Sequence, residues 1–290
     1  MHVLHQPPRL FQINATRWRL ASLLAACDWL RLRSRSGLSR LLRQLRISLK
    51  AVRAHVHSPD ANYVAKLRDV QQLARLPQPV SEGVLMFADE FTFFRHPSLA
   101  PAYEQMGPAQ RLAELGFSKN RTWRVTAALN AWTGQVSFLD AGQISVGRLV
   151  AFYQQVRDQY PTSSSIFWVE DNWPLHFHPN VLAALQPQTI VWPLPRPASW
   201  SGPVGRVKRL NLPLRLLPLP TYASWTNPIE KLWRWLRQDL LHNHSFGDDW
   251  DGLRQAVRDW LKQFSTGSPE LLRYTGLADP TRLYRSLFMT

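Results

Sequence analysis

The chain has 290 residues, with 35 Lys and Arg against 20 Asp and Glu, and a formal net charge of +15. Its length allows a substantial buried core, and 45% hydrophobic residues exclude wholesale disorder. Cys27 is the single cysteine, which excludes a disulfide and a cysteine-based zinc site. No apolar run reaches the roughly 20 residues of a membrane span, and no signal peptide is apparent, so we expect a cytoplasmic protein.

The positive charge is concentrated near the N-terminus. Residues 1–80 carry 14 Lys and Arg against three Asp, whereas the other 210 residues carry 21 basic against 17 acidic side chains. A concentrated basic region is typical of proteins that bind DNA or RNA, although an anionic membrane surface would also attract it. The tryptophan-rich remainder resembles a packed domain and favours a nucleic acid as the partner.

The basic region has helical periodicity. Residues 16–30, 37–45 and 49–56 predict three short helices, with a tight turn at 46–48 before the last. This order indicates a helix-turn-helix, and a basic, solvated helical region without groove contacts is the alternative. The side chains that would contact DNA are Arg40, Arg43, Arg46, Lys50, Arg53 and His55.

A fourth helix leads out of the basic region. Ser58 is a predicted N-cap and Pro59 a first helical residue, so we expect a helix that runs to Leu76. Prolines at 77 and 79 end it, where the charge also falls. The sequence therefore predicts a DNA-binding region and linker helix over 1–76 and a second domain over 77–290.

The second domain has the pattern of an α/β fold. Strands are predicted over 83–91, 123–129, 135–139 and 166–170, with short apolar segments at 189–192 and 214–217. Helices are predicted over 146–160, 179–185, 227–241 and 249–264. This order is typical of an RNase H-like domain, a mixed five-stranded sheet with flanking helices. The proline-rich, basic segment 193–213 interrupts it and is interpreted as an insertion.

Three acidic residues stand where such a fold could bring them together. Asp89 ends the apolar run 84–88, Asp171 follows the strand 166–170, and Glu230 lies one turn into the helix that begins at 227. Carboxylate oxygens suit Mg²⁺, and two such ions can assist an in-line phosphoryl displacement. Glu90, next to Asp89, should face away because side chains alternate along a strand.

Each acid also has a simpler interpretation. Asp89 could be a solvated strand end, Asp171 could form an Asx-type turn, and Glu230 could complete a capping box with Asn227. After Asp171, two polar side chains could orient the carboxylate or contact phosphate, namely Asn172 and His176. His242 and His244 lack companion ligands and are interpreted as surface polar residues.

The approach to Glu230 carries a longer motif. Residues 219–233 read L-P-T-Y-A-S-W-T-N-P-I-E-K-L-W, and this string resembles the third signature of mariner-like DDE transposases in their bacterial insertion-sequence branch. Asp89-Glu90 and the segment from Asp171 to His176 match the first two acidic motifs of that family in order and context. The resemblance covers roughly residues 83–242.

The resemblance implies a DNA transposase, a metal-dependent polynucleotidyl transferase and endonuclease. Hydrolysis at the ends of the element would free a 3′-OH that attacks target DNA at a TA site. Asp89, Asp171 and Glu230 would hold two Mg²⁺ ions, for which Mn²⁺ could substitute. One ion would activate the attacking oxygen and the other would stabilise the leaving oxygen. The partners would be double-stranded DNA, as terminal inverted repeats and target, and a second copy in a homodimer.

Two features depart from the family pattern. The 58 residues between Asp171 and Glu230 exceed the usual spacing, and segment 193–213 accounts for the excess. The chain has room for one helix-turn-helix unit where the family usually has two, so a truncated N-terminus is expected. A truncated or domesticated relative that binds DNA without catalysis is therefore an alternative function. An RNase H-like nuclease that cuts without joining is another.

Overall fold

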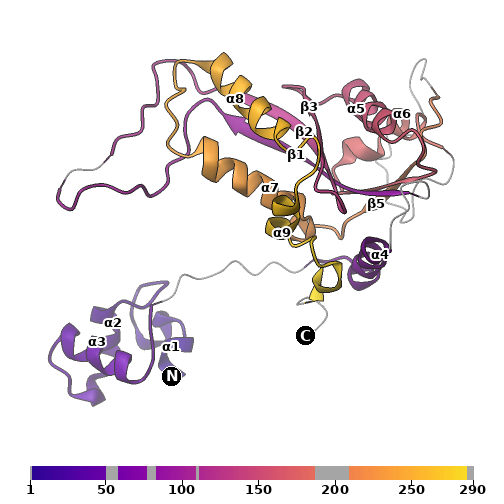
Figure 1. Ribbon diagram of the computed structural model, residues 1–290. Helices are drawn as coiled ribbons and strands as arrows, with labels where there is room; N and C mark the ends of the chain where they lie inside the picture. Colours follow the sequence, from indigo (N-terminus) through magenta and orange to yellow (C-terminus); the bar gives the residue numbers. More distant parts are fainter. Residues whose placement is uncertain (1, 50–57, 77–82, 109–110, 187–208, 286–290) are drawn as a thin grey trace. The chain divides into compact units, whose positions relative to one another are not determined.

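The computed structural model describes residues 2–49, 58–76, 83–108, 111–186 and 209–285 (Figure 1). The chain forms two compact units, residues 1–55 and residues 56–290, and each is described by itself. Among the described residues, no helix is long and apolar enough to cross a membrane.

The first unit consists of short helices around a small apolar core. Ser34 starts its longest helix, because the hydroxyl accepts a hydrogen bond from the Gly37 N–H at 3.1 Å. Leu23, Cys27 and Leu38 are buried between the helices. The elements are α1 (His2–His5), the 3₁₀ helices η1 (Pro8–Phe11) and η2 (Asp28–Leu30), α2 (Leu20–Ala26) and α3 (Arg35–Gln44).

The predicted helices of this unit are found in part. The helix expected over 37–45 is present as α3, whereas the one expected over 16–30 is divided into α2 and η2. At the division the Asp28 carboxylate accepts the Trp29 N–H at 2.7 Å, a local bond that competes with helical pairing. The third helix, expected over 49–56, falls outside the described residues except for Leu49. The helix-turn-helix therefore stays a prediction.

The second unit is built on a mixed five-stranded sheet (Figure 1). Its strand order is β3-β2-β1-β4-β5, with β1 antiparallel to β2 and parallel to β4, and with β5 parallel to β4. The predicted mixed sheet with flanking helices is confirmed. The strands are β1 (Val84–Phe94), β2 (Thr122–Asn130), β3 (Val136–Asp140), β4 (Ile166–Glu170) and β5 (Leu214–Pro218).

Helices cover both faces of this sheet, as Figure 1 shows. One face packs against α5 (Val146–Gln159), η3 (Pro174–Phe177) and α6 (Pro179–Leu182). The other packs against α4 (Tyr63–Arg75), α7 (Ile229–Leu236), α8 (Trp250–Lys262) and α9 (Pro269–Thr275). Two 3₁₀ helices complete the unit, η4 (Ser224–Thr226) before α7 and η6 (Pro280–Arg282) after α9.

Strand β1 contributes to both layers because its side chains alternate. Leu85, Phe87 and Phe91 belong to the core on the α7 side, whereas Val84 and Met86 belong to the core on the α5 side. With this period of two, position 89 faces α7 and position 90 faces the α5 layer.

Helix α4 corrects the predicted domain boundary. Leu67, Val70 and Ala74 lie in the same core as the sheet, so the helix belongs to the second unit and the chain divides near residue 55 rather than 76. Ser58 also does not cap it, because α4 starts at Tyr63. The Ser58 hydroxyl instead donates to the carbonyl oxygen of residue 221 at 2.6 Å, which ties this segment to the approach to α7.

Removing α4 is therefore expected to unfold the second unit, whereas removing residues 1–55 is not. Loss of a buried leucine such as Leu67 costs about 2–5 kcal/mol, a large part of the stability of an ordinary domain. Thermal unfolding of fragments 56–290 and 77–290 tests this. A cooperative transition at the same temperature in both fragments would contradict the assignment of α4.

Helix α7 ends in an irregular turn. Residues Arg237–Leu241 form a π-helix, η5, directly after α7 and before the segment that leads to α8. A π-turn holds an extra residue per turn and is often found near functional sites. The sequence pattern over 227–241 predicted a continuous helix and gave no sign of this change.

Candidate metal centre

Two of the predicted acids lie on neighbouring parallel strands, but only Asp171 follows the end of its strand. Asp89 lies in the middle of β1, which continues to Phe94, so the predicted strand end at Asp89 is wrong. Strand β1 pairs with β4 so that Phe87 is level with Val169, and the same register brings Asp89 level with Asp171 just beyond β4. Adjacent strands lie about 4.8 Å apart. Asp89 is partly buried, and 47% of the Asp171 side chain is exposed.

Glu230 is held at the same edge by the start of α7. The Asn227 side chain donates through Nδ2 to the carbonyl oxygen of Ala88 at 2.9 Å, one residue before Asp89. This bond attaches the helix to β1. No side chain caps α7, and the Glu230 N–H donates to the Asn227 carbonyl oxygen at 3.2 Å. The capping-box interpretation of Asn227 and Glu230 is therefore wrong.

One turn further along α7, Trp233 contacts the first acid directly. Its indole Nε1 donates a hydrogen bond to Oδ2 of Asp89 at 2.9 Å. The ring is 1% exposed and stacks on Phe91 with 5.0 Å between centroids. The predicted burial of Trp233 is confirmed, and the side chain also fixes the carboxylate of Asp89.

The three acids repel one another. Burial, and then the charges of Glu230, Glu90 and Asp171, raise the pKa of Asp89 well above its usual range. Burial also raises the pKa of Glu230, the Arg237 guanidinium opposes that rise, and Asp171 adds to it. A divalent cation would relieve this repulsion, and a set of carboxylate oxygens suits Mg²⁺. The residues present therefore fit such an ion.

Behind the acids lies a buried histidine among carboxylates. His176 is 1% exposed, and its Nε2 lies 3.3 Å from Oε1 of Glu90. Its Nδ1 lies 3.4 Å from Glu170 and 3.5 Å from Asp171. Burial lowers the pKa of His176, but the charges of Glu170 and Glu90 outweigh it and raise the pKa to about 10. The imidazole is therefore a cation at neutral pH.

This histidine is better explained as part of an ion-pair network than as a metal ligand. Within the described residues, ligand atoms of Glu90, Asp171 and His176 lie within 4.8 Å of one another. Both ring nitrogens of His176 face carboxylates, Nε2 that of Glu90 and Nδ1 that of Glu170, which is the arrangement of an ion-pair network. Glu90 points into this network, away from the α7 side that Asp89 faces, as strand alternation predicts.

His176→Ala is expected to lower the free energy of unfolding by about 3–5 kcal/mol, because it leaves Glu90 and Glu170 buried without a cation. The folded pKa lies above the usual 6.5, so the contribution is complete below about pH 6.5 and is lost as the pH rises towards 10. Urea unfolding across this range tests it. The difference in unfolding free energy between the wild type and His176→Ala should become smaller as the pH rises, unlike the difference for the control His242→Ala. A difference that does not change with pH would exclude the ion-pair role.

Sequence reasoning missed Glu170 as a site residue. Its side chain is 1% exposed, and Oε2 accepts hydrogen bonds from the Tyr153 hydroxyl at 3.1 Å and from Trp168 Nε1 at 2.8 Å. Burial raises its pKa to about 7. The available signal was a second acid directly before Asp171 in an otherwise apolar strand.

The predicted supporting residue Asn172 acts on the backbone. Its Nδ2 donates to the Leu219 carbonyl oxygen at 2.7 Å, which ties the loop after β4 to the residue that follows β5. The carboxylate of Asp171 does form the Asx-type turn, accepting the Trp173 N–H at 2.8 Å. The turn and the metal-ligand role are compatible, because the other carboxylate oxygen remains available.

The six predicted DNA contacts all belong to the first unit, and the structure describes three of them. Arg40, Arg43 and Arg46 are exposed on and just after α3. Lys50, Arg53 and His55 are outside the described residues. His244, predicted to be a surface residue, is instead 8% exposed and accepts the Phe246 N–H at 3.2 Å through Nδ1.

Comparison with known proteins identifies the family. The profile of a family described as "DDE superfamily endonuclease" matches residues 84–251. The fold is similar to the Mos1 transposase paired-end complex with left transposon end, at a TM-score of 0.57 and 16% identity, covering 92% of this chain and 76% of that one. It is also similar to the mariner Mos1 paired end complex with Mg, at a TM-score of 0.57 and 15% identity, covering 94% of this chain and 80% of that one. No curated protein matches the sequence.

The matched segment begins with β1, which carries Asp89, and extends past Glu230 to the start of α8. It therefore contains all three acids, the sheet and the helix that positions the third acid. With more than half of its residues covered by the profile, this chain belongs to the DDE superfamily endonucleases.

Proposed function

We propose that the protein is a DNA transposase of the bacterial insertion-sequence branch, which cuts the ends of a DNA element and joins them to target DNA at TA sites. The observation that supports this most strongly is the proximity of Asp89, Asp171 and Glu230: the charges of Glu230 and Asp171 help to raise the pKa of Asp89, and the charge of Asp171 helps to raise the pKa of Glu230. These residues would hold two divalent ions, Mg²⁺ or Mn²⁺. When bound, such ions supply charge stabilisation for the oxygens of an in-line displacement.

The surrounding residues would orient these acids. Trp233 holds one oxygen of Asp89, and Asn227 fixes α7 against β1, which sets the position of Glu230. His176 holds the loop that carries Asp171 from the side away from solvent. Small displacements of catalytic groups have large effects on rate, so a rigid support of this kind suits phosphoryl transfer.

The basic N-terminal region would hold the DNA. Residues 1–80 carry 14 Lys and Arg, and Arg40, Arg43 and Arg46 are exposed to contact phosphates. Affinity that rests on such contacts falls steeply as salt concentration increases. This role assigns the protein to the cytoplasm of a bacterium, next to the chromosome.

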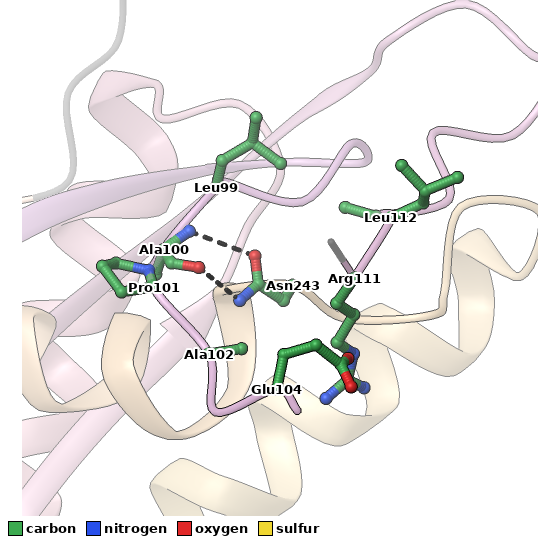
Figure 2. A pocket seen from close by; sticks show the side chains of 9 residues that line it. Leu99, Ala100, Pro101, Ala102, Glu104, Arg111, Leu112 and Asn243 are labelled. Carbon is green, nitrogen blue, oxygen red and sulfur yellow. Dashed lines mark hydrogen bonds between the residues drawn. The ribbon is translucent and has the colours of Figure 1, made fainter. Parts of the chain in front are cut away.

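The connection between β1 and β2 would contact a second copy. It is fixed at its base by Asn243, whose Oδ1 accepts the Ala100 N–H at 3.1 Å and whose Nδ2 donates to the Ala100 carbonyl oxygen at 2.8 Å (Figure 2). The connection exposes large apolar side chains, Leu99 directly before this anchor and Tyr103, Met106, Leu112 and Phe117 after it. Apolar surface of this kind is typical of a protein interface and supports a homodimer on DNA.

Cleavage of DNA that carries the element's ends tests the proposal. The substrate is the DNA that flanks the coding sequence, with and without Mg²⁺. A transposase should nick it at defined positions and then join the freed 3′ ends to a second DNA. Defined nicks without joining would indicate a nuclease, and metal-independent binding without nicks would indicate a non-catalytic relative. Either outcome would contradict the proposal.

A further inference from the structure

A second concave site opens beside Glu230 on the outer side of α7. The cavity has a volume of about 590 Å³ and lies between the start of α7 and the chain from α9 to η6. Helices α7 and α9 pack against each other, as Figure 1 shows. Cavities of this size accommodate small molecules and nucleotides.

Cations outnumber acids around this cavity. Four basic side chains line it, and two carboxylates, those of Glu230 and Asp279, accompany them. Asp279 is engaged, because it lies 3.0 Å from Nε of Arg282. The remaining basic residues are Lys231, Arg234 and Arg273.

Lys231 is the least exposed of these three basic residues. Its ammonium donates to the carbonyl oxygen of Thr275 at 2.8 Å rather than to an acid. Arg234 and Arg273 are both exposed. The cavity therefore presents two exposed guanidinium groups beside a partly buried ammonium, an arrangement that attracts an anion.

An aromatic ring stands beside these cations. Trp225 lines the cavity from the 3₁₀ helix η4, and 46% of its surface is exposed. Trp225 belongs to the motif of residues 219–233, but it is neither one of the three acids nor part of the buried core of the domain. An exposed ring next to guanidinium groups is the combination that binds unpaired nucleotides, by stacking on the base and pairing with the phosphate.

We propose that this cavity binds an unpaired nucleotide at the end of a DNA strand, with its phosphate at Arg234 and Arg273 and its base on Trp225. The concave shape favours a single flexible strand over the rigid backbone of a duplex. Arg234 follows Glu230 by four residues, about 6 Å along the axis of α7. The bound nucleotide would thus adjoin the strand that the three acids cut, and in this respect the inference rests on the proposed function.

Binding of the full-length protein to two DNAs tests the inference. Fluorescence anisotropy in EDTA compares a short duplex that has a single-stranded 3′ overhang with the same duplex made blunt. Trp225→Ala should weaken binding of the overhang DNA roughly tenfold and leave the blunt DNA unchanged. Trp225→Phe should restore most of the loss. Arg273→Ala should also weaken binding of the overhang DNA. It should reduce the slope of log affinity against log salt concentration by about one.

The control is Lys262→Ala, which removes an exposed cation that does not line the cavity. Equal losses on both DNAs would show that the cavity contacts duplex, and unchanged affinity for both would show that it does not bind DNA. Either result overturns the inference. A wild type that prefers the overhang through Trp225 but never cuts DNA with Mg²⁺ would refute the transposase proposal and leave the nucleotide site standing.

Discussion

Asp89→Asn is expected to abolish metal-dependent DNA cleavage while DNA affinity stays close to that of the wild type. Loss of a group that only supports a metal ligand lowers activity about 10–100-fold, so loss of a ligand should exceed that. Affinity should persist because the predicted DNA contacts lie in the basic N-terminal region. Nicking assays with Mg²⁺ and anisotropy on the same DNA measure the two effects separately.

The same variant should be more stable than the wild type without metal. The pKa of Asp89 is raised in the folded state, so its ionised form opposes folding at neutral pH, and this unfavourable contribution becomes smaller as the pH falls. Mg²⁺ should then raise the melting temperature of the wild type but not of Asp89→Asn. The exposed acid Asp259 provides the control, as Asp259→Asn should keep the response to Mg²⁺. An equal rise in the melting temperature of Asp89→Asn with Mg²⁺ would show that Asp89 is not a ligand of the metal.

Trp233→Ala is expected to lower both the stability and the cleavage activity of the protein. The ring is 1% exposed and stacked on Phe91, so its loss should cost about 3–5 kcal/mol. It also removes the hydrogen bond to Asp89, so cleavage should fall in the fraction that remains folded. Urea unfolding and cleavage below the melting temperature measure the two effects.

Two variants separate packing from positioning. Trp233→Phe retains an aromatic ring against Phe91 but leaves the carboxylate of Asp89 without its donor, which should cost about 1–3 kcal/mol and still lower cleavage. Trp235→Ala removes a ring from the same helix that packs on Trp260 and Tyr274 instead. It should lower stability without altering cleavage by the folded protein. Equal activity losses in Trp233→Phe and Trp235→Ala would indicate a packing effect alone.

The sheet could be predicted because the relevant signals are local. The apolar run before Asp171 indicates a strand that ends there, as β4 does, whereas the run before Asp89 predicted the strand but not its end, because β1 continues to Phe94. The spacing of Ile229, Leu232 and Trp233 indicates which side of α7 is buried, and all three are buried. These patterns depend on residues that are close in sequence, where side-chain periodicity is reliable.

The interactions that support the site could not be predicted, because they join distant residues. His176 meets Glu90 across 86 positions, and Asn227 reaches Ala88 across 139. In the sequence, Asn227 and Glu230 have the spacing of a capping box, and only the approach of β1 redirects the asparagine side chain. Ser58 gave a similar false signal, since its hydroxyl bonds to Thr221 rather than to a helix.

The π-helix after α7 limits how the length of this segment can change. An α-helix turns by about 100° per residue, so deleting one residue from Arg237–Leu241 could restore regular helix but would rotate everything that follows. Asn243 comes two residues later and anchors the connection between β1 and β2. The length of the segment between Glu230 and Asn243 should therefore be more constrained than the types of most residues in it. A one-residue deletion in this segment should be more harmful than a substitution.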